Sequence, residues 1–126
     1  MDLHYFFGWL TAFVWTCAIE IPIYALFFRP RFKSPWTAVG LAFGLQVVTH
    51  PTLWYAIPQF EPYETWLLVA ETGVTTTEAL LASVALHLAD RSQPGRAVGV
   101  GALAAIVANV TTTYVGGWMN NWIYGL

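Results

Sequence analysis

Four long segments of the chain are nearly free of charged side chains, and this pattern constrains the fold more than any other feature. They cover residues 5–28, 36–57, 64–88 and 97–119. Each reaches the roughly 20 residues that a helix needs to cross the hydrocarbon core of a bilayer. We therefore predict an all-α, polytopic membrane protein, with one four-span domain that covers residues 1–126.

The composition supports this class. Of the residues, 57% are hydrophobic and only 10% are charged, against about 25% charged in a typical soluble domain. A net charge of −2 and the absence of basic runs argue against a nucleic-acid partner. The connections are short, so consecutive helices should be antiparallel neighbours. The expected architecture is an antiparallel four-helix transmembrane bundle, with the lipid bilayer as its surroundings.

The basic residues predict the orientation. All five Lys and Arg residues fall in two connections: Arg29, Arg31 and Lys33 in the first, and Arg91 and Arg96 in the third. Short loops rich in Lys and Arg stay in the cytoplasm. We therefore expect loops 29–35 and 89–96 to be cytoplasmic and both termini to be non-cytoplasmic, in a bacterial or archaeal inner membrane.

Both cytoplasmic loops contain signals for the start of a helix. Ser34 followed by Pro35, and Ser92 followed by Pro94, suit an N-cap and a first turn. We expect the second and fourth spans to begin at these two points.

Each of the four spans carries polar residues along one face, at the 100° spacing of a helix. In chain order the faces hold Thr16 with Glu20, Gln46 with His50, Glu71 with Thr75 and Glu78, and Asn109 with Thr113. The simplest arrangement that hides four polar faces from lipid is a bundle with those faces turned inward.

Depth along the helices divides these residues into three layers. At 1.5 Å per residue from the outer ends, His50 and Glu71 lie roughly 10 Å deep, and Glu20 and Glu78 roughly 21 Å deep. A neutral layer between them takes one residue from each helix: Thr16, Gln46, Thr75 and Asn109.

Three carboxylates lie in the interior of the spans, Glu20, Glu71 and Glu78, and no Lys or Arg lies in the same segments. Another cation must balance them, and the choices are a proton, a charged His50, or a bound metal or alkali ion. Glu20 and Glu78, at one depth, would share a proton and titrate as a pair. We therefore name Glu20, His50, Glu71 and Glu78 as a candidate ion or substrate site, supported by the neutral layer. The alternative is a set of protonated, hydrogen-bonded groups that only hold the helices in register.

Two titratable residues stand next to prolines. Pro51 follows His50 directly, and Pro22 follows Glu20 by two positions. A proline inside a helix frees a backbone carbonyl, and broken helices near the membrane midplane are typical of transporters. This pattern favours a transport site.

Small residues offer surfaces for close helix packing. Gly40 and Gly44 form a GxxxG pattern on the second span, turned away from His50. The fourth span has a longer small-residue face: Gly101, Ala105, Ala108, Thr112 and Gly116. These faces could pack within one chain, between copies, or against a partner membrane subunit.

Signatures of enzyme chemistry are missing from the sequence. It has no HExxH, no Glu-x-x-His and no paired His or Cys spacing. A divalent metal cofactor remains an alternative, but the sequence identifies no set of ligands for it. Binding of a pigment or quinone to the aromatic first span is a further alternative. We name no catalytic residue.

Three functions follow, in order of support. The first is proton- or cation-linked transport by an oligomer. The second is a noncatalytic structural or assembly subunit of a larger membrane complex. The third is a membrane-embedded metal-dependent enzyme.

Overall fold

The computed structural model describes the backbone of residues 2–124 and the side chains of residues 2–116 and 118. Its four α-helices are α1 (Leu3–Phe28), α2 (Pro35–Tyr55), α3 (Tyr63–Ala89) and α4 (Pro94–Tyr124), and a short 3-10 turn, η1 (Arg29–Arg31), follows α1. These helices match the predicted spans, except that α4 extends further at both ends. The prediction of an all-α bundle is confirmed.

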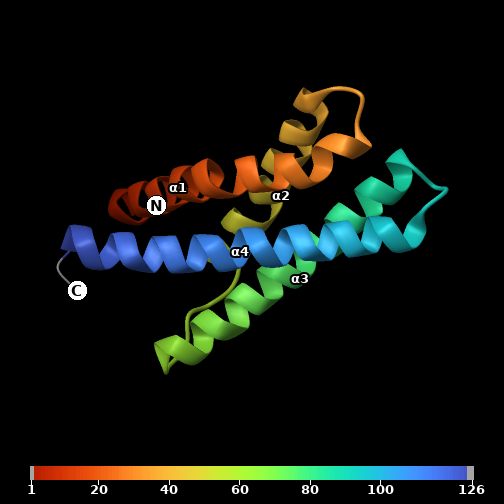
Figure 1. The fold of residues 1–126 in the computed structure, drawn as a ribbon. Helices are drawn as coiled ribbons and strands as arrows, with labels where there is room; N and C mark the ends of the chain where they lie inside the picture. Colours follow the sequence, from red (N-terminus) through yellow and green to blue (C-terminus); the bar gives the residue numbers. More distant parts are fainter. Residues whose placement is uncertain (1, 125–126) are drawn as a thin grey trace.

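The helices pack as a ring in chain order. Contacts join α1 to α2, α2 to α3, α3 to α4 and α4 back to α1, and they are most extensive between α3 and α4. Figure 1 shows the start of α1 and the end of α4 at one end of the bundle, and the α1–α2 and α3–α4 connections at the other. All five basic residues therefore lie at or near the end that is opposite the termini.

Three of the helical segments are long and apolar enough to cross a membrane: Leu3–Arg31, Tyr63–Ala89 and Pro94–Gly116. The search that found them covered only the part of the chain that the structure describes. Helix α2 is not among them, and its sequence explains why: Gln46, Thr49, His50 and Thr52 lower its hydropathy. That α2 also spans the membrane stays a prediction.

The two expected helix starts have different outcomes. Ser34 caps α2, where its Oγ accepts a hydrogen bond from the Trp36 backbone N–H at 3.2 Å. The cap expected at Ser92 is wrong, because α4 begins two residues later and the Ser92 hydroxyl donates to Asp90 Oδ1 at 2.5 Å. An acidic neighbour within reach competes for the hydroxyl that the cap would need.

The interruption expected at the prolines is also absent from the described helices. Pro22 lies inside α1 and Pro51 inside α2, and both helices continue through them. Each proline therefore removes one backbone hydrogen bond without ending the helix, which lipid-embedded helices tolerate when neighbours surround the gap.

Small side chains make up most of the apolar core. Seven of its buried members are alanines: Ala38, Ala42, Ala82, Ala97, Ala104, Ala105 and Ala108. Lipid offers no hydrophobic force to join helices, so close van der Waals packing of small residues has to hold them together. Gly101 shows how close this packing is, because a Cβ there would lie 2.6 Å from Ser83 Oγ on α3.

The GxxxG pair on α2 is not part of this packing. A Cβ placed on Gly40 or Gly44 would meet no atom of the described chain within 4 Å. Gly101 on the small-residue face of α4 therefore serves the contact with α3, whereas the face of Gly40 and Gly44 lies outside the bundle.

Candidate proton or ion site

Glu78 is the centre of the polar core. Its side chain comes from α3, is fully buried, and receives a hydrogen bond from each of the other three helices. Thr49 Oγ1 of α2 donates to Oε1 at 2.7 Å, Asn109 Nδ2 of α4 donates to Oε2 at 2.9 Å, and the Tyr24 hydroxyl of α1 donates to Oε2. Every helix of the bundle thus contributes to this one carboxyl group.

The donors reach Glu78 because each helix turns its packed face inward. On α1 the buried positions are Glu20, Tyr24 and Phe28, four residues apart, which places them on one stripe. On α4, Asn109 continues the stripe of Ala105, whose carbonyl accepts a second bond from the same amide at 2.9 Å. The alanine packing that joins the helices therefore also aims the polar side chains.

Glu20 forms a second buried carboxyl centre. Gln46 Nε2 donates to its Oε2 at 2.5 Å, and both side chains are almost completely buried. Glu20 also lies close enough to Glu78 for their charges to interact. The prediction that these two carboxylates occupy one region of the core agrees with this arrangement.

The charge balance of this region is unusual for a protein core. Within the described residues there is one ion pair, between Arg31 and Asp90 at 3.9 Å, and it lies near the α1–α2 connection. Glu20 and Glu78 have neutral partners instead. Burying two ionised carboxylates without a basic partner would be strongly destabilising, which makes this region a candidate proton or cation site.

His50 and Glu71, expected at one depth, have different hydrogen-bond partners in the structure. His50 Nε2 lies 3.2 Å from Thr16 Oγ1 of α1, and Glu71 Oε2 accepts from Thr113 Oγ1 of α4 at 3.3 Å. The reason is helix rotation: α2 turns His50 toward α1, and α3 turns Glu71 toward α4. The same depth therefore does not bring these two side chains together.

His50 lies among aromatic rings rather than carboxylates. Its ring centroid is 5.7 Å from that of Phe13 and 6.2 Å from that of Trp54, which it stacks upon. Its Nδ1 is buried and has no hydrogen-bond partner within the described residues. The ring therefore occupies the wall between α1 and α2, beside the core.

Thr75, unlike the other members of the expected neutral layer, makes no side-chain hydrogen bond to another helix among the described residues. Its hydroxyl donates to the Glu71 carbonyl of its own helix at 2.7 Å. This is the usual choice of a threonine inside a helix, because the carbonyl four residues earlier is always within reach. The other three members of the layer do bond across helices, but each to a different titratable group: Thr16 to His50, Gln46 to Glu20, and Asn109 to Glu78.

Two partners of Glu78 were not named as site residues from the sequence. Tyr24 follows Glu20 by four positions, so its place on the same stripe was a usable signal. Thr49 follows Gln46 by three positions, as His50 follows it by four, so the helical spacing allows either residue to share the face of Gln46. Only the rotation of α2 selects Thr49.

The part of the chain that the structure describes contains no set of side chains that could form a metal centre. There, no group of three or more His, Cys, Asp or Glu side chains lies close enough to hold a metal ion. Whether the residues above form a functional site stays a prediction. Comparison of the chain with models of protein families, with characterised proteins and with solved structures finds no match.

Proposed function

We propose that the protein carries protons across the membrane as an oligomer, and that Glu78 is the group that takes up and releases them. The observation that supports this most is the set of three neutral donors on one buried carboxyl group, without a basic residue beside it. Intramembrane ionisable residues are expensive to bury and commonly mark a proton or ion pathway.

The types of partner favour a proton over a metal or alkali ion. A cation needs oxygen ligands, whereas Asn109 directs its NH2 group at Glu78. Tyr24 and Thr49 approach through hydroxyl groups, and a hydroxyl can donate to a carboxylate or accept from a carboxylic acid by rotating its O–H bond. The surroundings of Glu78 can therefore satisfy both of its protonation states without moving a helix.

The other carboxyl groups extend this centre in two directions. Glu71 precedes Glu78 by seven residues on α3, or roughly 10 Å along the helix toward the α2–α3 connection. Glu20 shares the buried region with Glu78 and lies close enough for the two charges to interact. We propose that Glu71 links Glu78 to the outer surface and that Glu20 shares a proton with Glu78.

The test is proton flux in proteoliposomes loaded with a pH-sensitive dye, after an imposed pH gradient. We expect Glu78→Gln to reduce the flux at least tenfold, because the amide keeps the shape of the side chain but cannot exchange a proton. Glu64→Gln is the matched control: it changes an exposed glutamate in the first turn of the same helix, and should leave the flux unchanged.

Two results would contradict the proposal. One is wild-type flux no faster than that of protein-free liposomes. The other is a Glu78→Gln variant that transports as well as the wild type.

The oligomer is part of the proposal because four helices are few for a complete pathway. Gly40 and Gly44 support it, since their face lies outside the bundle and would let a second α2 approach closely. We expect Gly40→Leu with Gly44→Leu to convert an oligomer into monomers in detergent, measured by light scattering. Gly8→Leu with Gly99→Leu is the control, because a Cβ at either position also meets no atom within 4 Å.

The same face favours a second candidate function, that of a noncatalytic assembly subunit. In that case the purified wild type would be monomeric in detergent, and the variant with Gly40→Leu and Gly44→Leu would be monomeric as well. A wild-type oligomer that the double substitution dissociates would contradict it.

For the orientation, we propose that the end with the basic connections is cytoplasmic. Cysteines placed singly in a Cys17→Ser background test this with a maleimide that cannot cross membranes, because Cys17 is the only native cysteine. In intact cells we expect labelling of Gln59→Cys and not of Ser92→Cys. The reverse pattern would invert the orientation.

A further inference from the structure

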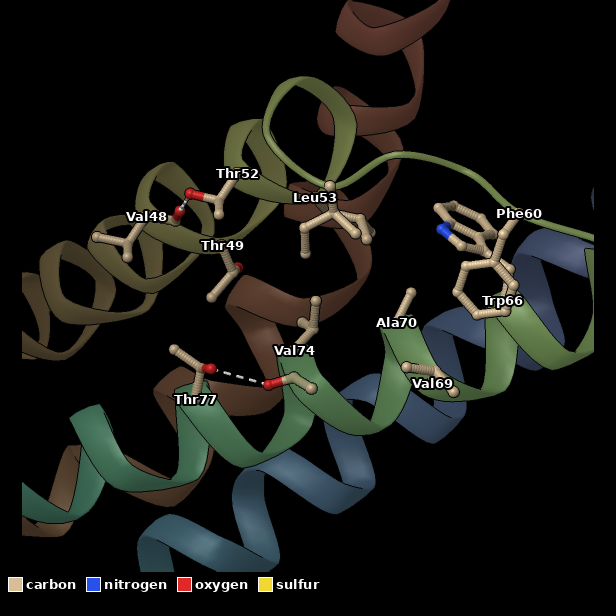
Figure 2. A pocket seen from close by; sticks show the side chains of 12 residues that line it. Val48, Thr49, Thr52, Leu53, Phe60, Trp66, Val69, Ala70, Val74 and Thr77 are labelled. Atoms are coloured by element: carbon tan, nitrogen blue, oxygen red, sulfur yellow. Dashed lines mark hydrogen bonds between the residues drawn. The ribbon is translucent and has the colours of Figure 1, made fainter.

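A pocket with a volume of about 290 Å³ lies between α2 and α3. Figure 2 shows Thr49 and Leu53 on the α2 side, Ala70 and Val74 on the α3 side, and the connection that carries Phe60 along one edge. These two helices make the least extensive contact of the four neighbouring pairs, which leaves room for the pocket. The pocket adjoins the polar core, and Thr49 belongs to both.

The walls of the pocket are mostly apolar, and two of its three threonines add little polarity to them. Thr52 Oγ1 donates to the Val48 carbonyl at 2.6 Å, and Thr77 Oγ1 donates to the Gly73 carbonyl at 2.8 Å. Their hydroxyls are thus occupied by their own helices. Val48, with 51% of its surface exposed, lies at the rim. In a membrane such a rim faces acyl chains, so a ligand would enter from the bilayer and would have to be lipophilic.

Two lining residues bring a polar group that matters here. One is Trp66, whose buried Nε1 has no hydrogen-bond partner within the described residues, and the other is Thr49. Its single hydroxyl proton has two acceptors within reach, the Leu45 carbonyl at 2.9 Å and Glu78 Oε1 at 2.7 Å. Among the described residues, none donates to Thr49 Oγ1, so the oxygen retains capacity to accept. A polar group that meets Thr49 must therefore bring its own proton, as a hydroxyl or an amine does.

The volume sets the size of the ligand. Sites for drug-sized molecules take about 300–1,000 Å³, so this pocket suits a smaller one. At the ~30 Å³ that a water molecule occupies in the liquid, it has room for roughly ten non-hydrogen atoms.

We propose that this pocket binds a small lipophilic alcohol or amine that enters from the bilayer, with its O–H or N–H group donating to Thr49 Oγ1. The bound molecule would then be one hydrogen bond away from Glu78. The binding does not depend on proton transport, and its test involves no flux.

The probe is an octanol that carries a photoreactive diazirine, applied to the protein in phosphatidylcholine nanodiscs, with labelled residues mapped by mass spectrometry. We expect the label on residues 48–57 and 66–77. Unlabelled octanol should compete, and octane at the same membrane concentration should not, because it lacks the donor.

Two pairs of variants sharpen the test. Gly73 lines the pocket and has no atom within 4 Å of a new Cβ, so Gly73→Leu should fill the space and reduce labelling at least fivefold. Gly99→Leu, at an equally open position on α4, should leave labelling unchanged. Thr49→Val should remove the octanol preference, whereas Thr49→Ser should retain it.

Circular dichroism and gel filtration report whether each variant folds. If Thr49→Val does not fold, Gly73→Leu and the octane competition decide the question. The proposal is overturned if octane competes as well as octanol, if Gly73→Leu is labelled like the wild type, or if the label is equally strong around the lipid-facing Leu103 of α4.

Discussion

Asn109 Nδ2 lies 2.9 Å from Glu78 Oε2, and this bond between two buried side chains joins α4 to α3. The same NH2 group donates to the Ala105 carbonyl at 2.9 Å, and an amide has two protons, so both bonds form together. The amide is thereby held in one orientation, with its second proton aimed at the carboxyl group.

Replacing this amide should destabilise the bundle. We predict that Asn109→Ala lowers the free energy of unfolding by about 0.6–2 kcal/mol, the range for hydrogen bonds between membrane helices. Val110→Ala removes a similar volume from the neighbouring, half-exposed position and should have a smaller effect. Unfolding by denaturant in detergent micelles measures both, and equal losses would mean that the bond to Glu78 contributes nothing measurable.

Glu20 and Gln46 should behave as a unit. Gln46→Met keeps the shape of the side chain but leaves Glu20 Oε2 without its donor at 2.5 Å, so we expect a loss of about 1–3 kcal/mol in the free energy of unfolding. Adding Glu20→Met removes the stranded acceptor and should recover part of that loss. A double-mutant cycle measures the coupling, and simple additivity of the two changes would contradict the pairing.

Gly101 should tolerate no side chain, in contrast to Gly99. A Cβ at position 101 would lie 2.9 Å from the backbone N of Ser83, and backbone cannot move aside as a side-chain tip can. We predict that Gly101→Ala costs about 1–3 kcal/mol by separating α3 from α4. Gly99→Ala meets no atom within 4 Å and should be neutral or stabilising, because alanine favours a helix more than glycine does. Thermal unfolding of the two variants in the same detergent compares them.

The connection between α3 and α4 should show a specific response to acid. Hydrogen bonds from the Ser92 hydroxyl and backbone N–H, with a lesser contribution from Arg31, hold the pKa of Asp90 below its usual value. Because the folded-state pKa is the lower one, the stabilisation is present above the unfolded value of about 3.9 and is lost as the pH falls through the folded-state pKa.

Ser92→Ala removes the largest of these contributions, so we predict that the pKa of Asp90 moves back up toward its usual value. An NMR titration of the Asp90 carboxyl carbon measures the change. Ser34→Ala, in the other basic connection, is the control and should leave the titration where it is. A Ser92→Ala titration that coincides with the wild type would show that the hydroxyl has no such effect.

Hydropathy and helical spacing were sufficient to predict the four helices and the burial of Glu20, Gln46, Glu78 and Asn109. Both are local properties of the chain. The length of an uncharged segment sets where a helix begins and ends, and the expense of a polar group in lipid requires that it face inward. Neither depends on which other helix lies opposite.

The partners of these residues depend on how far each helix turns about its own axis, and no local pattern contains that angle. Gln46 has neighbours at three and four positions, Thr49 and His50, and either could have faced the core. The packing of Ala38, Ala42 and Leu45 turns α2 so that Thr49 meets Glu78 while His50 meets Thr16. The sequence was thus sufficient to predict that Glu20, Gln46, Glu78 and Asn109 are buried, whereas the tertiary packing of small side chains decided which partners they touch.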